Sequence, residues 1–182
     1  IAIDDETVRE ALVALVGDEA EAAALRAAAA GSLGPVLEDW DLSLVDPRDA
    51  DEVPAGFVEI RALLRRLYER AADGELRRRA LEASVHAPEE WHLPAVRAAW
   101  ADADPAWKTT AVFCMRFVRG FEEEIVAALR YDDPDVVYEA ACAAGVWGVR
   151  PAWERIRALA VSAGTEKRTR IAAIEAVAAI RP

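Results

Sequence analysis

The chain has 182 residues, enough for one domain with a substantial buried core. Its formal net charge is −11, its 22 basic residues comprise 20 Arg and 2 Lys, and it contains neither Asn nor Gln. Because following a phosphate backbone requires clustered Lys and Arg, this acidic chain makes nucleic acid an unlikely partner.

The sequence carries no signal for membrane insertion or secretion. No apolar run reaches the roughly 18 residues that a transmembrane helix needs, and the acidic start IAIDDETVRE lacks the basic region of a signal peptide. Cys114 and Cys142 lie in apolar stretches without a CxxC spacing, so we interpret both as small buried residues. We therefore expect a cytoplasmic protein that makes no contact with a membrane.

The first third of the chain holds the whole charge imbalance. Residues 1–53 contain 14 acidic and three basic residues, whereas residues 54–182 contain 19 of each. Residues 1–37 are predicted to form N-terminal helices, as a degenerate repeat or a cap, with two helices over 4–30 and a short helical turn over 35–40. Residues 38–53 then read as an acidic loop, because EDWDLSLVDPRDADEVP (38–54) has seven acidic residues, one Arg and two prolines.

Residues 54–72 predict the next helix, since apolar residues recur there at helical spacing. These are Phe57, Ile60, Leu63, Leu64 and Leu67. Seven arginines crowd into this helix and the start of the next: Arg61, Arg65, Arg66, Arg70, Arg77, Arg78 and Arg79. One interpretation is two solvated faces with ordinary i,i+4 pairs. The other is that the acidic loop docks on them through four carboxylates: Asp46, Asp49, Asp51 and Glu52.

A repeat of about 30 residues follows. In each copy an acidic residue precedes an Ala by seven positions and a second small residue by ten. The four copies are Asp73/Ala80/Ala83, Asp104/Ala111/Cys114, Asp133/Ala140/Ala143 and Glu166/Ala173/Ala176, and Asp4 to Ala11 echoes the first step. An acidic residue at a helix start caps free N–H groups, and small residues at i and i+3 let a neighbouring helix come close.

Shorter helices are predicted after the long ones, over 91–101, 121–130 and 151–162. Each long helix and the shorter helix after it are taken as one unit. The long helix over 166–180 has no such successor before Pro182. We therefore expect that the native product continues, or that this uncapped helix allows self-association.

DDPDVVYEAACAAGVWG (132–148) resembles short bacterial HEAT repeats, in which D-P-x-V-R-x-A-A-x-A-L-G recurs. Val137 stands where Arg is usual, and Ala144 where Leu is usual. The resemblance covers residues 73–181. It implies an all-α fold: an α-solenoid of stacked antiparallel helix pairs with a right-handed superhelix, forming one continuous domain over 54–182.

No catalytic constellation is visible, so we expect neither an enzyme nor a cofactor or metal site. His86 and His92 are too few for metal ligation, the serines have no recognisable base, and no phosphate-binding glycine loop occurs. The expected function is a non-catalytic protein–protein interaction scaffold that binds a partner on a concave surface of the shorter helices. The candidate partner-binding residues are Arg65, Trp91, Arg97, Glu123, Trp153, Glu154 and Arg157.

Two alternatives stay open. The first is a HEAT-like nucleic-acid-binding protein or DNA base-repair enzyme, because Trp100, Asp104 and Trp107 imitate the aromatics and carboxylate of HEAT-like alkyl-base DNA glycosylases. Those enzymes need a basic groove, which the sequence does not make evident. The second is a purely structural segment of a larger protein.

Overall fold

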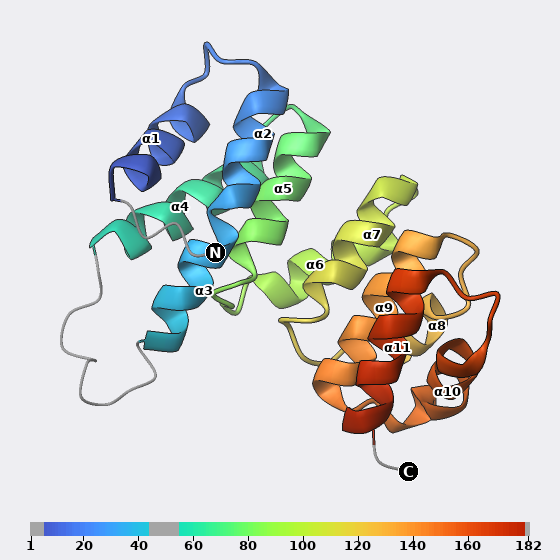
Figure 1. Ribbon diagram of the computed structural model, residues 1–182. Helices are drawn as coiled ribbons and strands as arrows, with labels where there is room; N and C mark the ends of the chain where they lie inside the picture. The colour runs from blue at the N-terminus through green and yellow to red at the C-terminus, as the bar shows by residue number, and fades with distance from the viewer. Residues whose placement is uncertain (1–5, 44–54, 181–182) are drawn as a thin grey trace. The chain divides into compact units, whose positions relative to one another are not determined.

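The computed structural model describes residues 6–43 and 55–180, and within them the chain is helical without any β-strand. The predicted all-α class is therefore confirmed. The chain divides into two compact units, unit 1 (Ile1–Glu89) and unit 2 (Glu90–Pro182), each of which is described by itself (Figure 1). No helix in the described ranges is both long and apolar enough to cross a membrane.

Unit 1 contains α1 (Glu6–Gly17), α2 (Ala23–Ser32), α3 (Gly34–Ser43), α4 (Ala55–Arg70) and α5 (Gly74–Ser84). Helices α2 and α5 lie side by side, α1 packs on α2, and α4 packs on α5 (Figure 1). Helices α2 and α5, which come from opposite sides of the acidic segment, therefore form one core. The boundaries predicted at 37 and 53 follow charge and composition and stay a prediction.

Helix α3 corrects the prediction of a loop beginning at residue 38, because it continues to Ser43. Leu37 is fully buried, and Trp40 packs edge-on against Phe57 with ring centroids 6.1 Å apart. Glu38 on the same helix lies 2.8 Å from Nδ1 of His86. The short apolar spacing from Leu37 to Trp40 stabilises helix where composition indicates loop. The remaining loop residues, with the four carboxylates proposed to dock, lie outside the described residues.

The core of unit 1 is built around α4. Its five predicted stripe residues are all buried, with exposed fractions of 7 % or less, so the predicted helix and its inward face are confirmed. They pack with apolar residues of α1, α2 and α5, including Val16, Ala30 and Leu76. Full burial of a Leu or Phe side chain stabilises the fold by about 1.5–3 kcal/mol.

Unit 2 contains α6 (His92–Ala101), α7 (Pro105–Cys114), α8 (Glu122–Ala128), α9 (Pro134–Trp147), the 3₁₀ turn η1 (Arg150–Ala152), α10 (Trp153–Val161) and α11 (Lys167–Ala179). The long helix α9 packs against both α7 and α11. Three helices each pack mainly on the helix that follows: α6 on α7, α8 on α9 and α10 on α11 (Figure 1). Each helix of the repeat motif therefore pairs with the helix before it, the reverse of the predicted pairing.

The predicted small residues lie where the long helices are packed. Ala80, Ala111, Ala140 and Ala173 are fully buried, and the residues three positions later are 2 % exposed or less. A Cβ added to Gly145 of α9 would come within 3.1 Å of the Cα and Cβ of Ala176 in α11. The echo in the first helix is wrong, since Ala11 is exposed.

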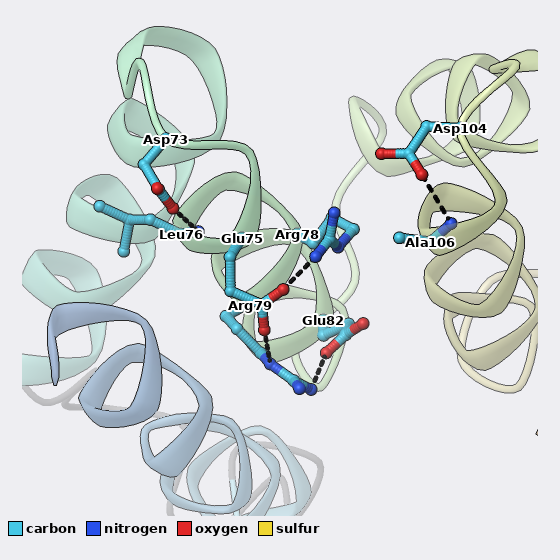
Figure 2. A network of polar contacts seen from close by, with 8 residues as sticks. All are labelled: Asp73, Glu75, Leu76, Arg78, Arg79, Glu82, Asp104 and Ala106. Carbon is cyan, nitrogen blue, oxygen red and sulfur yellow. Dashed lines mark hydrogen bonds and ion pairs between the residues drawn. The ribbon is translucent and has the colours of Figure 1, made fainter. Parts of the chain in front are cut away.

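Capping by the acidic residues is confirmed for three of the four copies. Asp73 accepts from the backbone N–H of Leu76 at 2.8 Å, and Asp104 accepts from that of Ala106 at 2.9 Å (Figure 2). Asp133 accepts from the N–H of Asp135 at 2.8 Å. The N-cap Glu166 makes no such bond, because a Glu side chain is longer than the favoured cap residues.

A basic residue four positions after the N-cap ties each of three helices, α2, α5 and α7, to the helix before it. Arg77 Nε donates to the carbonyl of Tyr68 at the end of α4, at 3.0 Å. Lys108 Nζ donates to the carbonyl of Trp100 at the end of α6, and in α2 an arginine does the same for α1. Cations are favourable at helix C-termini, whose last carbonyls lack helical partners.

Helix α9 departs from this pattern because Val137 occupies the basic position. The carbonyl of Leu129, at the end of α8, instead accepts from Arg155 Nε of α10 at 3.0 Å. The position at which the quoted motif usually has Arg is thus the position of the clamp. A later helix supplies the missing guanidinium.

Most of the crowded arginines of unit 1 are engaged in ion pairs. Arg65 pairs with Glu69 at 2.9 Å on α4, and Arg61 pairs with Glu89 at 2.6 Å. On α5, Glu75 and Glu82 bind two neighbouring arginines (Figure 2). The interpretation as solvated faces with short-range pairs is confirmed for Arg65, Arg78 and Arg79, whereas Arg61 pairs with a residue far along the chain.

Candidate partner-binding surface

The structure places the predicted partner-binding residues on α4, α6, α8 and α10, with Trp91 at the N-cap of α6. Arg65 lies on α4 of unit 1, and Trp91 is the half-buried N-cap of α6, its ring 3.8 Å from that of His92. The other five lie on α6, α8 and α10: Arg97, Glu123, Trp153, Glu154 and Arg157. Their role in binding stays a prediction.

Two local contacts join members of this set to their surroundings. Glu154 and Arg157 form an exposed ion pair at 3.0 Å on α10. Arg97 donates to the carbonyl of Gly120 at 3.4 Å and lies 4.0 Å from Glu124, which places it beside Glu123 at the start of α8. Such exposed pairs contribute little to stability, about 0–1 kcal/mol each, so these side chains are free to exchange partners.

A second surface, formed by α7, the segment after it, α9 and α11 of unit 2, was not predicted from the sequence. We call it the arginine–aromatic face. Its members are Phe113, Arg116, Phe117, Arg119, Tyr138, Trp147 and Arg168. The four aromatic rings and Arg116 are half-buried, while Arg119 and Arg168 are exposed. Contacts between a guanidinium and a ring link neighbouring members of the face.

Arg116 holds the centre of this face. Its Cζ lies 5.5 Å and 5.7 Å from the ring centroids of Phe113 and Phe117. Its Nη1 donates to Glu139 of α9 at 3.2 Å. Its buried Nε has no hydrogen-bond partner among the described residues. Arg116 therefore joins the segment after α7 to α9 and stacks on aromatic rings, as the planar guanidinium favours.

Trp147 and Arg119 form one end of the face. Nε1 of Trp147 donates to the carbonyl of Met115 at 2.6 Å, which fixes the indole plane. The Cζ of Arg119 lies 4.6 Å from the indole centroid. Within the described ranges Arg119 has no ion-pair partner, and the neighbouring Val146 is 56 % exposed. This end thus presents an unpaired cation beside apolar surface.

Tyr138 and Arg168 form the other end. The Cζ of Arg168 lies 5.0 Å from the Tyr138 ring centroid, and Arg168 also pairs with Asp135. Burial raises the pKa of the nearby Cys142 thiol, and the charge of Cys142 together with burial raises the pKa of the Tyr138 phenol. Both groups are therefore neutral near pH 7 and present hydrogen-bonding and apolar surface rather than a nucleophile.

The residues invoked for a base-repair enzyme are engaged in structural contacts. Asp104 caps α7, and the Trp100 ring packs on Tyr131 at 5.6 Å, with Lys108 Nζ 4.6 Å from its centroid. His92 is fully buried. In the described ranges no group of three or more His, Cys, Asp or Glu residues is placed to hold a metal ion.

Sequence reasoning missed the arginine–aromatic face because its members come from α7, the segment after it, α9 and α11. The close spacing of Phe113, Arg116 and Phe117 is the one local signal, although α7 ends at Cys114 and the last two lie in the turn that follows. Trp147 and Arg168 join them through packing of α9 on α7 and α11.

A comparison with protein-family models found no match to this chain, and a comparison with curated proteins found none either.

Proposed function

We propose that this protein is a non-catalytic protein-binding scaffold that engages its partner through the arginine–aromatic face of unit 2. The observation that supports this most directly is the unpaired, exposed Arg119 stacked on the fixed indole of Trp147. Trp, Tyr, Phe and Arg are enriched in protein–protein interfaces and dominate their binding energy.

The chemistry of the face defines what it would contact. A carboxylate or backbone carbonyl of the partner would accept from Arg119, and an apolar side chain would cover Val146 and the indole edge. The indole is already oriented by its bond to Met115, so little conformational entropy is lost when a partner binds. Truncating such an anchor typically weakens binding by 2 kcal/mol or more, or about thirtyfold.

We further propose that the helix pairs belong to a HEAT-like α-solenoid. The supporting features are the repeated cap, the clamp four residues later and the buried small residues seven and ten positions after the cap. In a solenoid each repeat packs on its neighbours and leaves extended faces for a partner. The six predicted binding residues of unit 2 define an alternative binding face of that unit, while Arg65 lies on unit 1.

The experiment is affinity purification with the full-length protein as bait from its own cells, after nuclease treatment, followed by quantitative mass spectrometry. Three baits are compared: wild type, Arg119→Glu and Arg157→Glu. The two variants carry the same charge change at exposed arginines, one on the arginine–aromatic face and one on the short helix α10.

The proposal predicts one stoichiometric partner that Arg119→Glu loses and Arg157→Glu retains. The reverse pattern would transfer binding to the short-helix face predicted from the sequence. Recovery of nucleic acid alone, in a control without nuclease, would refute the protein-binding proposal and favour the nucleic-acid reader.

A further inference from the structure

Unit 1 contains a pocket of about 550 Å³ that the proposed function does not use. It lies where the turn after α1, helix α2, helix α4 and the start of α5 meet. Three arginines line it: Arg26, Arg66 and Arg70. Unit 1 is the more acidic of the two units, yet this pocket gathers three cationic side chains.

Arg66 and Arg70 differ from the other arginines of α4. They lie one helical turn apart and so project from the same side of the helix. Both are exposed, and neither has an ion-pair partner among the described residues. Arg61 and Arg65, on the same helix, are paired with Glu89 and Glu69. On α4 the two arginines outside the pocket are therefore ion-paired, and the two that line it are not.

Arg26 adds a third guanidinium in a fixed position. Its Nε donates to the carbonyl of Val16 at 3.0 Å, and Arg26 has no carboxylate partner in the described part of the chain. Its terminal nitrogens remain available as donors, because Nε makes the structural bond. The clamp that closes α1 on α2 therefore also orients a cation at the pocket.

Two carboxylates share the pocket but do not neutralise it. Asp73 lines it, yet its Oδ1 already accepts from the N–H of Leu76 as the cap of α5. Glu19 lies on the exposed turn after α1. Three cations therefore face two carboxylates, and the positive end of the α5 dipole begins beside them.

The floor of the pocket is apolar. Leu63, Leu67 and Leu76 line it, and their side chains are almost completely buried. A ligand suited to both parts has an oxyanion head and an apolar body. Guanidinium groups bind phosphate and carboxylate oxygens in a bidentate manner, while contact with the leucines adds apolar burial.

We propose that this pocket binds a small organic oxyanion, with its phosphate or carboxylate group on Arg66 and Arg70 and its apolar body against Leu63 and Leu67. The proposal rests on unit 1 alone and does not depend on the protein-binding function of unit 2. The two head groups share one recognition chemistry, and the choice between them is made by the probes.

The test is isothermal titration of the full-length protein with phenyl phosphate, benzoate and inorganic phosphate at fixed ionic strength. Phenyl phosphate or benzoate should bind saturably, about tenfold tighter than inorganic phosphate, because the ring covers the apolar floor. The tighter of the two aromatic probes identifies the head group. The double variant Arg66→Ala/Arg70→Ala should weaken that binding by about tenfold or more.

The control is Arg130→Ala/Arg170→Ala, which removes the same charge from exposed arginines of unit 2. It should leave the affinity unchanged. An equal loss in both double variants would show general charge attraction and overturn the site. Absence of saturable binding by all three probes would also overturn it, as would equal affinities for phenyl phosphate and inorganic phosphate, since the floor would then make no contact.

Discussion

Replacing Ala140 by Asp tests the packing of the long helices most directly. Ala140 is fully buried in α9, which packs against both α7 and α11. Gly145, also on α9, lies so close to Ala176 of α11 that the two helices leave no room there for extra atoms. Overpacking costs about 1–3 kcal/mol, and an unpaired buried carboxyl costs about 1–3 kcal/mol more even when protonated. We expect a loss of at least about 3 kcal/mol.

The assay is urea unfolding followed by tryptophan fluorescence, because five of the six tryptophans lie in unit 2. The matched control is Ala98→Asp on the exposed face of α6, which loses mainly helix propensity, about 0.5–0.7 kcal/mol. In Ala140→Asp, burial would raise the folded-state pKa of the introduced carboxyl above its unfolded value. The folded state then retains the proton longer, so the deficit of Ala140→Asp grows as the pH rises above about 4. A loss within about 0.5 kcal/mol of the control would refute the packing argument.

Two further predictions concern the clamp and the thiol. Arg77→Ala removes a charged hydrogen bond to the end of α4, so the free energy of unfolding of unit 1 should fall by about 1–2 kcal/mol in urea titrations followed by circular dichroism. The control Arg66→Ala, on an exposed arginine without an ion pair, should change that free energy by less than about 0.5 kcal/mol. Equal effects of the two substitutions would contradict the stabilising role of the Arg77 clamp. The raised pKa of Cys142 lowers its thiolate fraction, so native protein should react with a thiol-specific disulfide reagent more slowly than free cysteine at pH 8, and the rate should still rise above about pH 8.5. A rate that levels off below that pH would contradict the burial argument.

Local sequence signals predicted the helices with good accuracy where one face is apolar. The stripe from Phe57 to Leu67 identified α4, and the cap-to-Ala spacing identified α5, α7, α9 and α11. These signals act within one or two helical turns, so they can be read without knowing the fold. The end of helix α3 was missed because its three acidic residues, followed by more acidic residues and prolines, read as a loop in a composition count.

Pairing and surfaces required the tertiary structure. The spacing pattern cannot say whether α6 packs on the helix before it or after it, because both neighbours lie at the end of a short connection. The structure answers this through contacts and through clamps such as Arg77 to Tyr68. Arg155 shows what spacing alone cannot predict. It binds the carbonyl that a basic residue at position 137 would bind, although it stands 18 positions after Val137.

The sequence by itself therefore determined the all-helical class, the helix ends with acidic caps and the inward small residues, because these depend on neighbours within about ten positions. Only the tertiary structure decided which neighbour each helix pairs with, the arginine–aromatic face and the arginine pocket of unit 1. Each of these brings together side chains from several helices, and whether an arginine is paired or unpaired depends on which carboxylates the packing places beside it.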